Sequence, residues 1–336
     1  MEKPYITVVI VCYNRKQFIL KAISSTLNQT LDKTKYEIIV VKAFKEETID
    51  KFIKIHNIKN IYSPNKREGF RLSIALKRAK GEVIALLDDD DEFAPKKLEI
   101  IYKYFIENPN LDFYHNNFYS INESGKIIAK PNDTNSKRVI KASNEREKLN
   151  LLNNIETFHP EQNASAMAVR KRLLLNNITN LKKITVALDG FLFLIGLAEG
   201  KELWIDSKPL SFYRLHSIGQ VTNGPLTTFY SFYKHRKKFT LIAVKDTYIL
   251  YNIAKGTIFE DFVKQKLSLS KLYYKLYNNS SKKMKYLPTL SDYFCFLSKP
   301  SKNKISFALQ TLAPGFLRTA VLKMIYKHYV KERKII

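Results

Sequence analysis

The stretch that most constrains the fold is residues 83–92, where five aliphatic residues run directly into five acidic ones. An unbroken aliphatic run of this length is typical of a strand buried on both faces of a sheet. The acidic residues would then lie at the carboxyl edge, where open α/β sheets bind ligands. Four adjacent aspartates repel one another when ionised, so we expect a bound cation, and oxygen ligands favour Mg²⁺ or Mn²⁺. A solvated acidic loop is the alternative, because blocks of like charge commonly face solvent.

Strand-like and helical segments alternate along the first third of the chain. Aliphatic runs predict strands at 5–11, 36–41 and 58–62, and apolar residues recur at helical spacing between them. Short connections between such segments indicate an α/β fold with a mostly parallel, doubly wound sheet and flanking helices. Farther along we expect a hairpin over 111–129, a surface loop over 131–144, a strand at 163–169, a helix at 190–198 and strands at 203–206 and 210–216.

The charge of the chain is large and unevenly spread. Fifty-seven Lys and Arg face 31 Asp and Glu, giving a net charge of +26 that indicates an anionic partner. Residues 223–336 hold 22 basic and 5 acidic residues, or +17 (22 − 5), and their pattern is helical and rich in Lys and Tyr. We therefore expect a catalytic domain over residues 1–222 and a basic, mainly helical region over residues 223–336.

Cysteine usage and hydropathy indicate a cytoplasmic protein. Cys12 and Cys295 lie far apart, which favours a reducing compartment. The first residues do not resemble a signal peptide, and no apolar run approaches the roughly 18 residues of a spanning helix. The last helical segment places apolar residues near one face and basic residues elsewhere, which predicts either peripheral contact with anionic lipid or packing on the catalytic domain; the apolar residues are Leu317, Val321, Met324, Ile325 and Tyr329.

Four segments, in order, resemble family 2 glycosyltransferases, which have the GT-A fold. Residues 7–15 resemble the opening strand of that family, and residues 79–91 resemble the segment that ends in its DxD motif. Leu188-Asp189 before an apolar helix resembles the catalytic-base segment, and residues 211–216 resemble the segment that closes the site. The resemblance covers residues 1 to about 222. It implies an inverting, metal-dependent enzyme that moves a sugar from a nucleotide-diphosphate-sugar to a hydroxyl or lipid phosphate, on a glycan or lipid-linked acceptor.

The resemblance also implies roles for individual residues. Asp90 would hold the Mn²⁺ or Mg²⁺ together with Asp88, although Asp89 and Asp91 leave the register open by one residue. Asp189 would be the catalytic base, although aspartate is also favoured as a simple helix N-cap. The remaining implied contacts are His216 with the metal, Arg214 with the diphosphate, and Cys12, Tyr13, Asn14, Asp88 and Asp89 with the nucleotide-sugar.

Two departures from the family pattern concern the donor. Lys42 stands where the family usually has an aspartate that accepts a hydrogen bond from uracil, and an ammonium group has donors only. Either the donor carries guanine, or Lys42 contacts phosphate while backbone groups read the base. Leu72 and Ser73 replace a frequent Arg-Asn pair, so that Arg71 either takes over a nucleotide-sugar contact or is a solvated helix residue.

Two other functions compete with the transferase. A sugar nucleotidyltransferase needs a glycine-rich loop after the first strand, and residues 12–17 contain no glycine. A catalytically altered GT-A domain that binds a polyanion or nucleic acid is permitted by the net charge. However, the acidic cluster would repel phosphate in the absence of metal, so a nucleic-acid partner is disfavoured.

Overall fold

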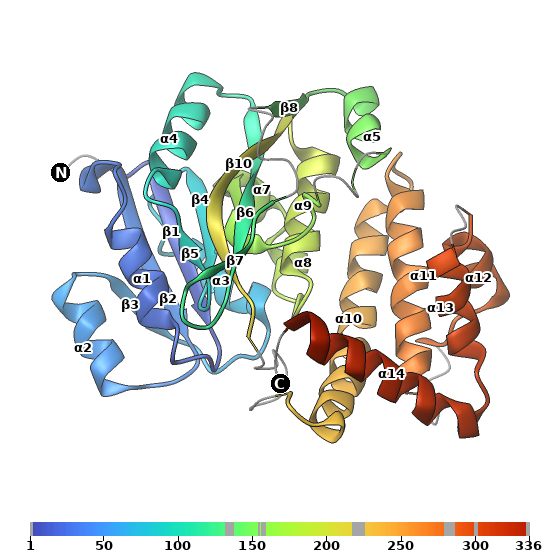
Figure 1. Cartoon of the computed structure of the whole chain (residues 1–336). Coiled ribbons are helices and arrows are strands. Elements are labelled where there is room, and N and C mark those ends of the chain that lie inside the picture. The colour runs from blue at the N-terminus through green and yellow to red at the C-terminus, as the bar shows by residue number, and fades with distance from the viewer. Residues whose placement is uncertain are drawn as a thin grey trace. The chain divides into compact units, whose positions relative to one another are not determined.

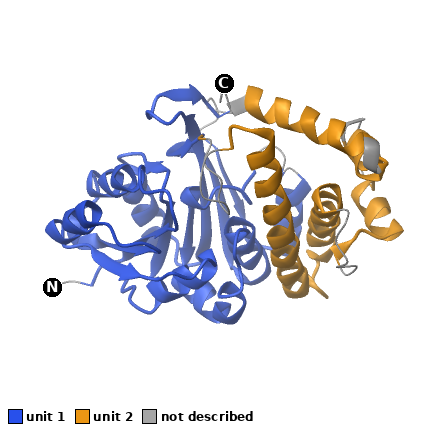
Figure 2. Cartoon of the chain, turned by 90° about the horizontal axis from the view of Figure 1, so that it is seen from below, with its two compact units in different colours: residues 1–215 blue, residues 216–336 orange. Residues whose placement is uncertain are grey.

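The computed structural model describes residues 3–131, 138–153, 155, 159–216, 226–278, 286–298 and 302–333. The chain divides into two compact units, residues 1–215 and residues 216–336 (Figure 2). The first unit contains the sheet, and the second consists of helices (Figure 1). In the described residues, no helix is both long enough and apolar enough to cross a membrane.

Four neighbouring parallel strands form one half of the sheet, in the order β3-β2-β1-β4. Alternate residues of β1, such as Ile6 and Val8, pack in one core with α1, α2 and α4. Helix α3 lies against β1 and β2 outside that core. This burial on both faces explains the continuous aliphatic runs. The elements are β1 (Ile6–Cys12), α1 (Ile19–Leu27), β2 (Tyr36–Lys42), α2 (Glu47–Ile55), β3 (Lys59–Tyr62), α3 (Glu68–Leu76), β4 (Val83–Asp88) and α4 (Lys97–Glu107).

The other half of the sheet mixes strand directions. β9 lies antiparallel between β4 and β6, and β6 pairs in parallel with β10. Six of the ten described strands (β1, β2, β3, β4, β6 and β10) therefore run in one direction, which confirms the predicted fold class. The remaining strands are β5 (Glu92–Phe93), β6 (Leu111–Ile121), β7 (Ile127–Ala129), β8 (Val139–Ala142), β9 (Met167–Arg170) and β10 (Glu202–Arg214).

Three sequence predictions in this half differ from the structure. The segment expected to be a surface loop contains β8, which pairs antiparallel with residues Leu203 to Asp206 of β10. The two strands expected at 203–206 and 210–216 are one strand, because register shifts on both sides of Pro209 let β10 continue along β6. A proline removes one ladder hydrogen bond but is tolerated at such irregularities. The predicted strand at 163–169 begins instead with a 3₁₀ turn, Ala164–Ala166, before β9.

Helices around β9 and β10 complete the first unit, and the second unit is helical, as predicted. α9 packs on β6 through an edge-to-face contact of Phe193 with Phe113. In the second unit, α10 and α11 lie side by side (Figure 1). The helices are α5 (Glu145–Asn153), α7 (Lys171–Asn176), α8 (Ile178–Leu181), α9 (Leu188–Glu199), α10 (Phe229–Ala254), α11 (Glu260–Tyr277), α12 (Leu290–Phe296), α13 (Lys302–Leu312) and α14 (Gly315–Arg333).

Candidate functional site

The acidic cluster lies at the carboxyl edge of the sheet. Asp88 is the last residue of β4, and a turn closed by the Asp91 N–H on the Asp88 carbonyl brings the next carboxylates back beside it. Carboxylate oxygens of Asp88, Asp90 and Asp91 lie within 4.8 Å of one another. Three hard oxygen donors at this separation fit Mg²⁺ or Mn²⁺. The sequence indicated Asp88 and Asp90, and the turn adds Asp91 as a third donor.

The cluster carries more negative charge than its surroundings compensate. Burial raises the pKa of Asp91 to about 8, and the charge of Asp90 adds to the shift. Burial also raises the pKa of Asp88, with further contributions from Glu68 and Asp91. Raised carboxylate pKa values mean that the ionised forms are unfavourable here until a cation joins them. The electrostatics therefore agree with the donor set.

Arg15 pairs with carboxylates of the aspartate turn. Its guanidinium group pairs with Asp89 at 2.6 Å and also with Asp90. Burial lowers the pKa of Arg15, but the two aspartates outweigh this effect and leave the pKa raised. No role for Arg15 was predicted from the sequence. The signal was available, because β1 and β4 are parallel neighbours with Val11 opposite Asp88, so that residues after both strands must meet.

The residues after β1 form a second wall with α3. Cys12 is buried, and burial together with a hydrogen bond to Asp89 raises the pKa of its thiol. The Arg71 guanidinium lies 5.3 Å from the centroid of the Tyr13 ring and donates to the Asn65 carbonyl at 2.6 Å. The Arg71 Nε atom is buried without a hydrogen-bond partner among the described residues. The structure thus brings Cys12, Tyr13 and Arg71 together beside the aspartates, with half-exposed Asn14 adjacent in the chain.

Lys42, at the end of β2, has partners within the fold. Its buried ammonium group pairs with Asp50 at 2.8 Å and donates to the Phe44 carbonyl at 2.8 Å. Two of its three hydrogens are therefore engaged, and Asp50 is fixed in turn by the Asn60 amide at 2.6 Å. This arrangement holds the loop after β2 against α2. It leaves little of Lys42 for a nucleotide base or a phosphate, both of which the sequence suggested.

Asp189 lies in the first turn of α9. Its carboxylate accepts hydrogen bonds from the Gly190 N–H at 2.8 Å and from the Asn163 N–H, while the N-cap position belongs to Ala187. Asn163 has a φ of 64°, a left-handed conformation that asparagine tolerates. Burial raises the pKa of Asp189 to about 6 despite these hydrogen bonds. A carboxylate poised near neutrality is suited to accept a proton.

Glu68 is a site residue that the sequence analysis missed. It is half-buried in the first turn of α3. Burial raises the pKa of Glu68 to about 7; Arg71 opposes the shift, and the charge of Asp189 adds to it. Glu68 therefore lies within electrostatic reach of Asp189 on one side and of Asp88 on the other. The carboxylates come from β4, α3 and α9, which no local sequence pattern relates.

Arg214, at the end of β10, lies behind the aspartate turn. Its Nε donates to the Asp90 carbonyl at 2.8 Å, its backbone N–H to Asp91 at 2.8 Å, and its remaining nitrogens to Glu92 and to the carbonyls of Asn122 and Glu123. With every nitrogen engaged, Arg214 fits the task of positioning the turn better than contact with a diphosphate. The strand predicted to reach His216 ends at Arg214, and His216 begins the second unit, so its metal contact stays a prediction.

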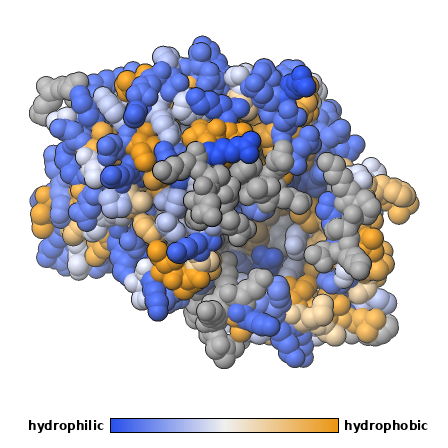
Figure 3. Space-filling view, turned by 45° about the horizontal axis from the view of Figure 1, so that its top comes forward, coloured by the Kyte–Doolittle hydropathy of each residue, from blue (hydrophilic) through white to orange (hydrophobic). Residues whose placement is uncertain are grey.

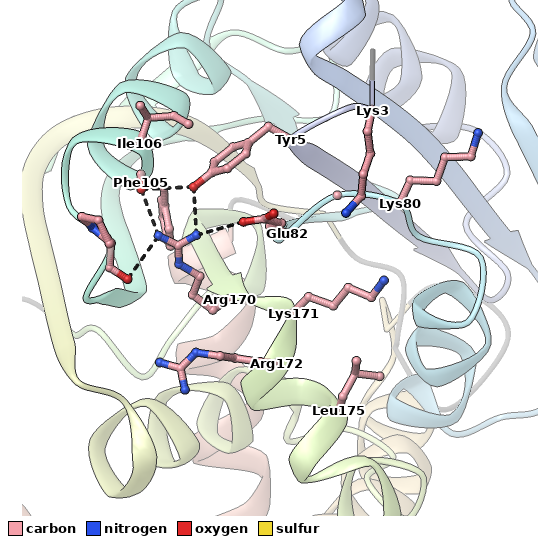
Figure 4. A pocket seen from close by; sticks show the side chains of 12 residues that line it. Lys3, Tyr5, Lys80, Glu82, Phe105, Ile106, Arg170, Lys171, Arg172 and Leu175 are labelled. Carbon is pink, nitrogen blue, oxygen red and sulfur yellow. Dashed lines mark hydrogen bonds and ion pairs between the residues drawn. The ribbon is translucent and has the colours of Figure 1, made fainter. Parts of the chain in front are cut away.

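A cavity of about 660 Å³ opens at the opposite, amino edge of the sheet (Figure 4). Its two arginines are already paired. Arg170 donates to Tyr5 Oη at 2.8 Å and to the carbonyls of Phe105 and Leu111 at 2.9 and 3.0 Å, and Arg172 donates to Asp112 at 2.6 Å. The Arg170 contacts connect β9 to α4 and to the residue that precedes β1, so this edge of the sheet stabilises the fold.

Comparison with known proteins agrees with this geometry. Residues 7–169 match the model of a family described as glycosyl transferase family 2. Residues 7–169 are therefore similar to family 2 glycosyltransferases. The match includes β1, the aspartate turn and β9, whereas Asp189 and Arg214 lie beyond it.

Two curated relatives each match little more than a third of the chain. An uncharacterized glycosyltransferase of Rickettsia bellii is 33% identical over 127 residues, which is 37% of this chain and 18% of that protein. The poly(ribitol-phosphate) β-N-acetylglucosaminyltransferase TarP of Staphylococcus aureus is 27% identical over 131 residues, 37% of this chain and 39% of that protein. The chain therefore matches about a fifth to two fifths of the length of these relatives.

Solved structures share the fold over most of the chain. Staphylococcus aureus TarS in complex with UDP-GlcNAc has a TM-score of 0.57 at 15% identity. The match covers 92% of this chain and 82% of the TarS chain. The mannosyltransferase of Pyrobaculum calidifontis in complex with GDP-Man and Mn²⁺ has a TM-score of 0.53 at 12% identity, with coverages of 93% and 85%. Both likenesses confirm the predicted GT-A fold.

Proposed function

We propose that this protein is an inverting, divalent-metal-dependent glycosyltransferase that uses a nucleotide-diphosphate-sugar. The observation that carries the proposal is the group of carboxylates from Asp88, Asp90 and Asp91 at the carboxyl edge of the sheet, with oxygens within 4.8 Å of one another. The family match over residues 7–169 supports the same reading. A neighbour of the same fold is described in complex with GDP-Man and Mn²⁺.

The three aspartates would hold Mg²⁺ or Mn²⁺, which as a Lewis acid offsets charge on the leaving diphosphate. Arg71 supports donor binding from the α3 side, because its unpaired Nε can donate to a phosphate oxygen and its guanidinium group lies 5.3 Å from the centroid of the Tyr13 ring. Arg15 lies beside the cluster and can add a second charge-assisted hydrogen bond. Arg214 fixes the aspartate turn from behind.

Asp189 is the base in this proposal. Its carboxylate accepts the proton of the acceptor hydroxyl while that oxygen bonds to the anomeric carbon from the face opposite the diphosphate. The bond from the anomeric carbon to the phosphate oxygen breaks, and the nucleoside diphosphate leaves with the electron pair. A pKa of about 6 leaves Asp189 largely ionised at neutral pH and still basic enough to accept this proton.

The donor base remains a choice between uracil and guanine, and the pairing of Lys42 with Asp50 removes the main reason to favour guanine. TarS is described with UDP-GlcNAc and the mannosyltransferase with GDP-Man. Titrating the protein with UDP and GDP in Mn²⁺ separates the two. We expect Lys42→Met to leave the preference unchanged; a switch in preference would return base selection to Lys42.

The acceptor is a glycan or a lipid-linked molecule in this proposal, and the net charge of +26 favours an anionic one. TarP is named for a poly(ribitol-phosphate) acceptor, which is itself anionic. Peripheral contact with the cytoplasmic face of a membrane would bring a lipid-linked acceptor within reach.

The direct test is to incubate the protein with nucleotide-sugars and Mn²⁺ and to follow the released sugar or product by NMR. We expect release of nucleoside diphosphate and an anomeric configuration opposite to that of the donor. Retention of configuration would contradict direct displacement, and stable donors with every sugar and acceptor supplied would contradict the transferase function.

A further inference from the structure

Ser165 connects the aspartate turn to the strands behind it. This residue is fully buried in the 3₁₀ turn that precedes β9. Its hydroxyl oxygen accepts a hydrogen bond from the Asp88 N–H at 2.9 Å. The hydroxyl also has a hydrogen to donate, and a hydrogen bond from Ser165 to the Asp91 carboxylate works against the raised pKa of Asp91. One hydroxyl group therefore contacts the first and the last aspartate of the turn.

Asn163, two residues earlier, connects the same 3₁₀ turn to the candidate base. Its backbone N–H donates to the Asp189 carboxylate, and its side-chain oxygen accepts from the Ser165 N–H at 3.0 Å. The backbone of Asn163 is in the left-handed conformation, with a φ of 64°. Such conformations cost free energy and are retained where the surrounding contacts fix them, often at functional sites. Asn163 and Ser165 thus hold Asp189 and the aspartate turn from the two ends of one short segment.

Buried polar side chains fix this segment from behind. The Ser165 carbonyl accepts from the Lys97 ammonium group of α4 and from the Ser211 hydroxyl of β10, the latter at 2.8 Å. Lys97 Nζ also donates to Ser211 Oγ at 2.8 Å. Lys97 and Ser211 are fully buried, whereas polar residues mostly lie at the surface, as on the largely hydrophilic face in Figure 3. The network anchors the carbonyl of Ser165 and leaves its hydroxyl to the aspartate turn.

We propose that Asn163 and Ser165 are positioning residues, which hold the base Asp189 at a fixed distance from the metal-binding turn. The inference rests on the proposed transferase reaction. In that reaction the diphosphate leaves on the side of the metal, while Asp189 removes the acceptor proton on the opposite face of the sugar. Both groups must be correctly placed at the same time, and a misplacement of about 1 Å can lower turnover about 100-fold. Neither positioning residue needs to touch the substrate, because each acts through the group that it holds.

The role of Ser165 is tested on metal-dependent binding. Ser165→Ala leaves the buried Asp88 N–H without its acceptor, so that the turn can shift from the geometry that binds the cation. We expect the Mn²⁺-dependent affinity for UDP or GDP, measured by isothermal titration, to fall about tenfold or more. Ser268→Ala is the matched control, because Ser268 is also buried and its hydroxyl donates to Asp292 at 3.1 Å in the second unit. It should bind nucleotide as wild type does.

The role of Asn163 is tested on turnover. Asn163→Ala disfavours the left-handed conformation that directs the N–H to Asp189, and should lower kcat about tenfold or more with a much smaller change in nucleotide affinity. Asn163→Gly keeps that conformation accessible and should retain more turnover than Asn163→Ala. A purely structural role would instead lower kcat and affinity together, in step with the folded fraction. All values are therefore expressed per folded molecule, with the folded fraction taken from denaturant unfolding.

The outcomes separate this inference from the proposed function. If wild type binds nucleotide with Mn²⁺ and Ser165→Ala binds it equally tightly, Ser165 does not position the turn. If Asn163→Ala turns over as wild type does, Asn163 does not position the base. Either result overturns the inference and leaves the transferase function intact, whereas no binding by wild type in Mn²⁺ would overturn both.

Discussion

The two edges of the sheet in the first unit handle buried charge in opposite ways. At the amino edge, Arg170 donates to the Tyr5 hydroxyl and the Phe105 carbonyl (Figure 4) and to the Leu111 carbonyl, and the exposed Arg172 neutralises the buried Asp112. At the carboxyl edge, Asp88 and Asp91 lie close together with raised pKa values, and Arg15 pairs with Asp89 and Asp90. Compensated charge contributes to the fold, whereas uncompensated charge is retained where a ligand supplies the missing partner.

The largest expected effect at the carboxyl edge is on turnover. Asp189→Asn removes the proton acceptor but keeps size and hydrogen bonding, and should lower kcat by about 10³-fold, within the usual range for a general base. Binding of the donor nucleotide should be unchanged. Glu82→Gln, an exposed carboxylate at the amino edge, is the control and should be silent. Full turnover by Asp189→Asn would remove Asp189 from the chemistry.

The next effect concerns the metal. Asp90→Ala should weaken Mn²⁺-dependent nucleotide binding by about 100-fold, because it removes a carboxylate from the group of three. Isothermal titration of nucleotide with and without Mn²⁺ measures this, again with Glu82→Gln as control. Unaltered binding would show that this aspartate does not hold the metal.

A substitution at the amino edge should affect stability instead. Arg170→Met removes the Arg170 hydrogen bond to the Leu111 carbonyl and one of two to the Phe105 carbonyl, which also accepts from the Tyr5 hydroxyl, and should lower the free energy of unfolding by about 1–3 kcal/mol. Denaturant unfolding measures the loss. Nucleotide affinity per folded molecule should be unchanged, and a selective loss of affinity at full stability would break the distinction between the two edges.

The smallest effect is the dependence of turnover on pH. Asp189 must be ionised to accept a proton, and its pKa is about 6. The turnover should therefore be level above that pH and fall about tenfold for each unit below it. A profile that rises as the pH falls would contradict a base at this position. In Asp189→Asn, the residual turnover should lose this inflection.

Local pattern predicted much of the fold in the parallel half of the sheet. The aliphatic runs at 36–41 and 83–87 correspond to β2 and β4, because a strand buried on both faces needs apolar residues at every position. The aspartate turn followed from the end of β4. By contrast, β8 has mixed residues and depends on pairing with β10, a partner some sixty residues away that local sequence does not specify.

Side-chain partners were less predictable than backbone elements. Their positions in the sequence predicted that Lys42 and Arg214 contact a ligand. In the structure Lys42 pairs with Asp50, and Arg214 donates to the carbonyls of Asn122 and Glu123. Glu68 of α3 joins the site because the fold brings it within electrostatic reach of Asp189 on α9, and such proximity is set by tertiary packing. The inward face of α14 was hidden for the same reason, because one helix does not reveal which face its neighbours cover.

The most direct test of the account is nucleotide binding by the wild-type protein in Mn²⁺ and in chelator. If the carboxyl edge is a metal-dependent donor site, UDP or GDP should bind in Mn²⁺, and binding should disappear on chelation and return when Mn²⁺ is restored. Equal binding with and without metal, or no binding of either nucleotide in Mn²⁺, would contradict the assignment of Asp88, Asp90 and Asp91 to a metal and diphosphate site.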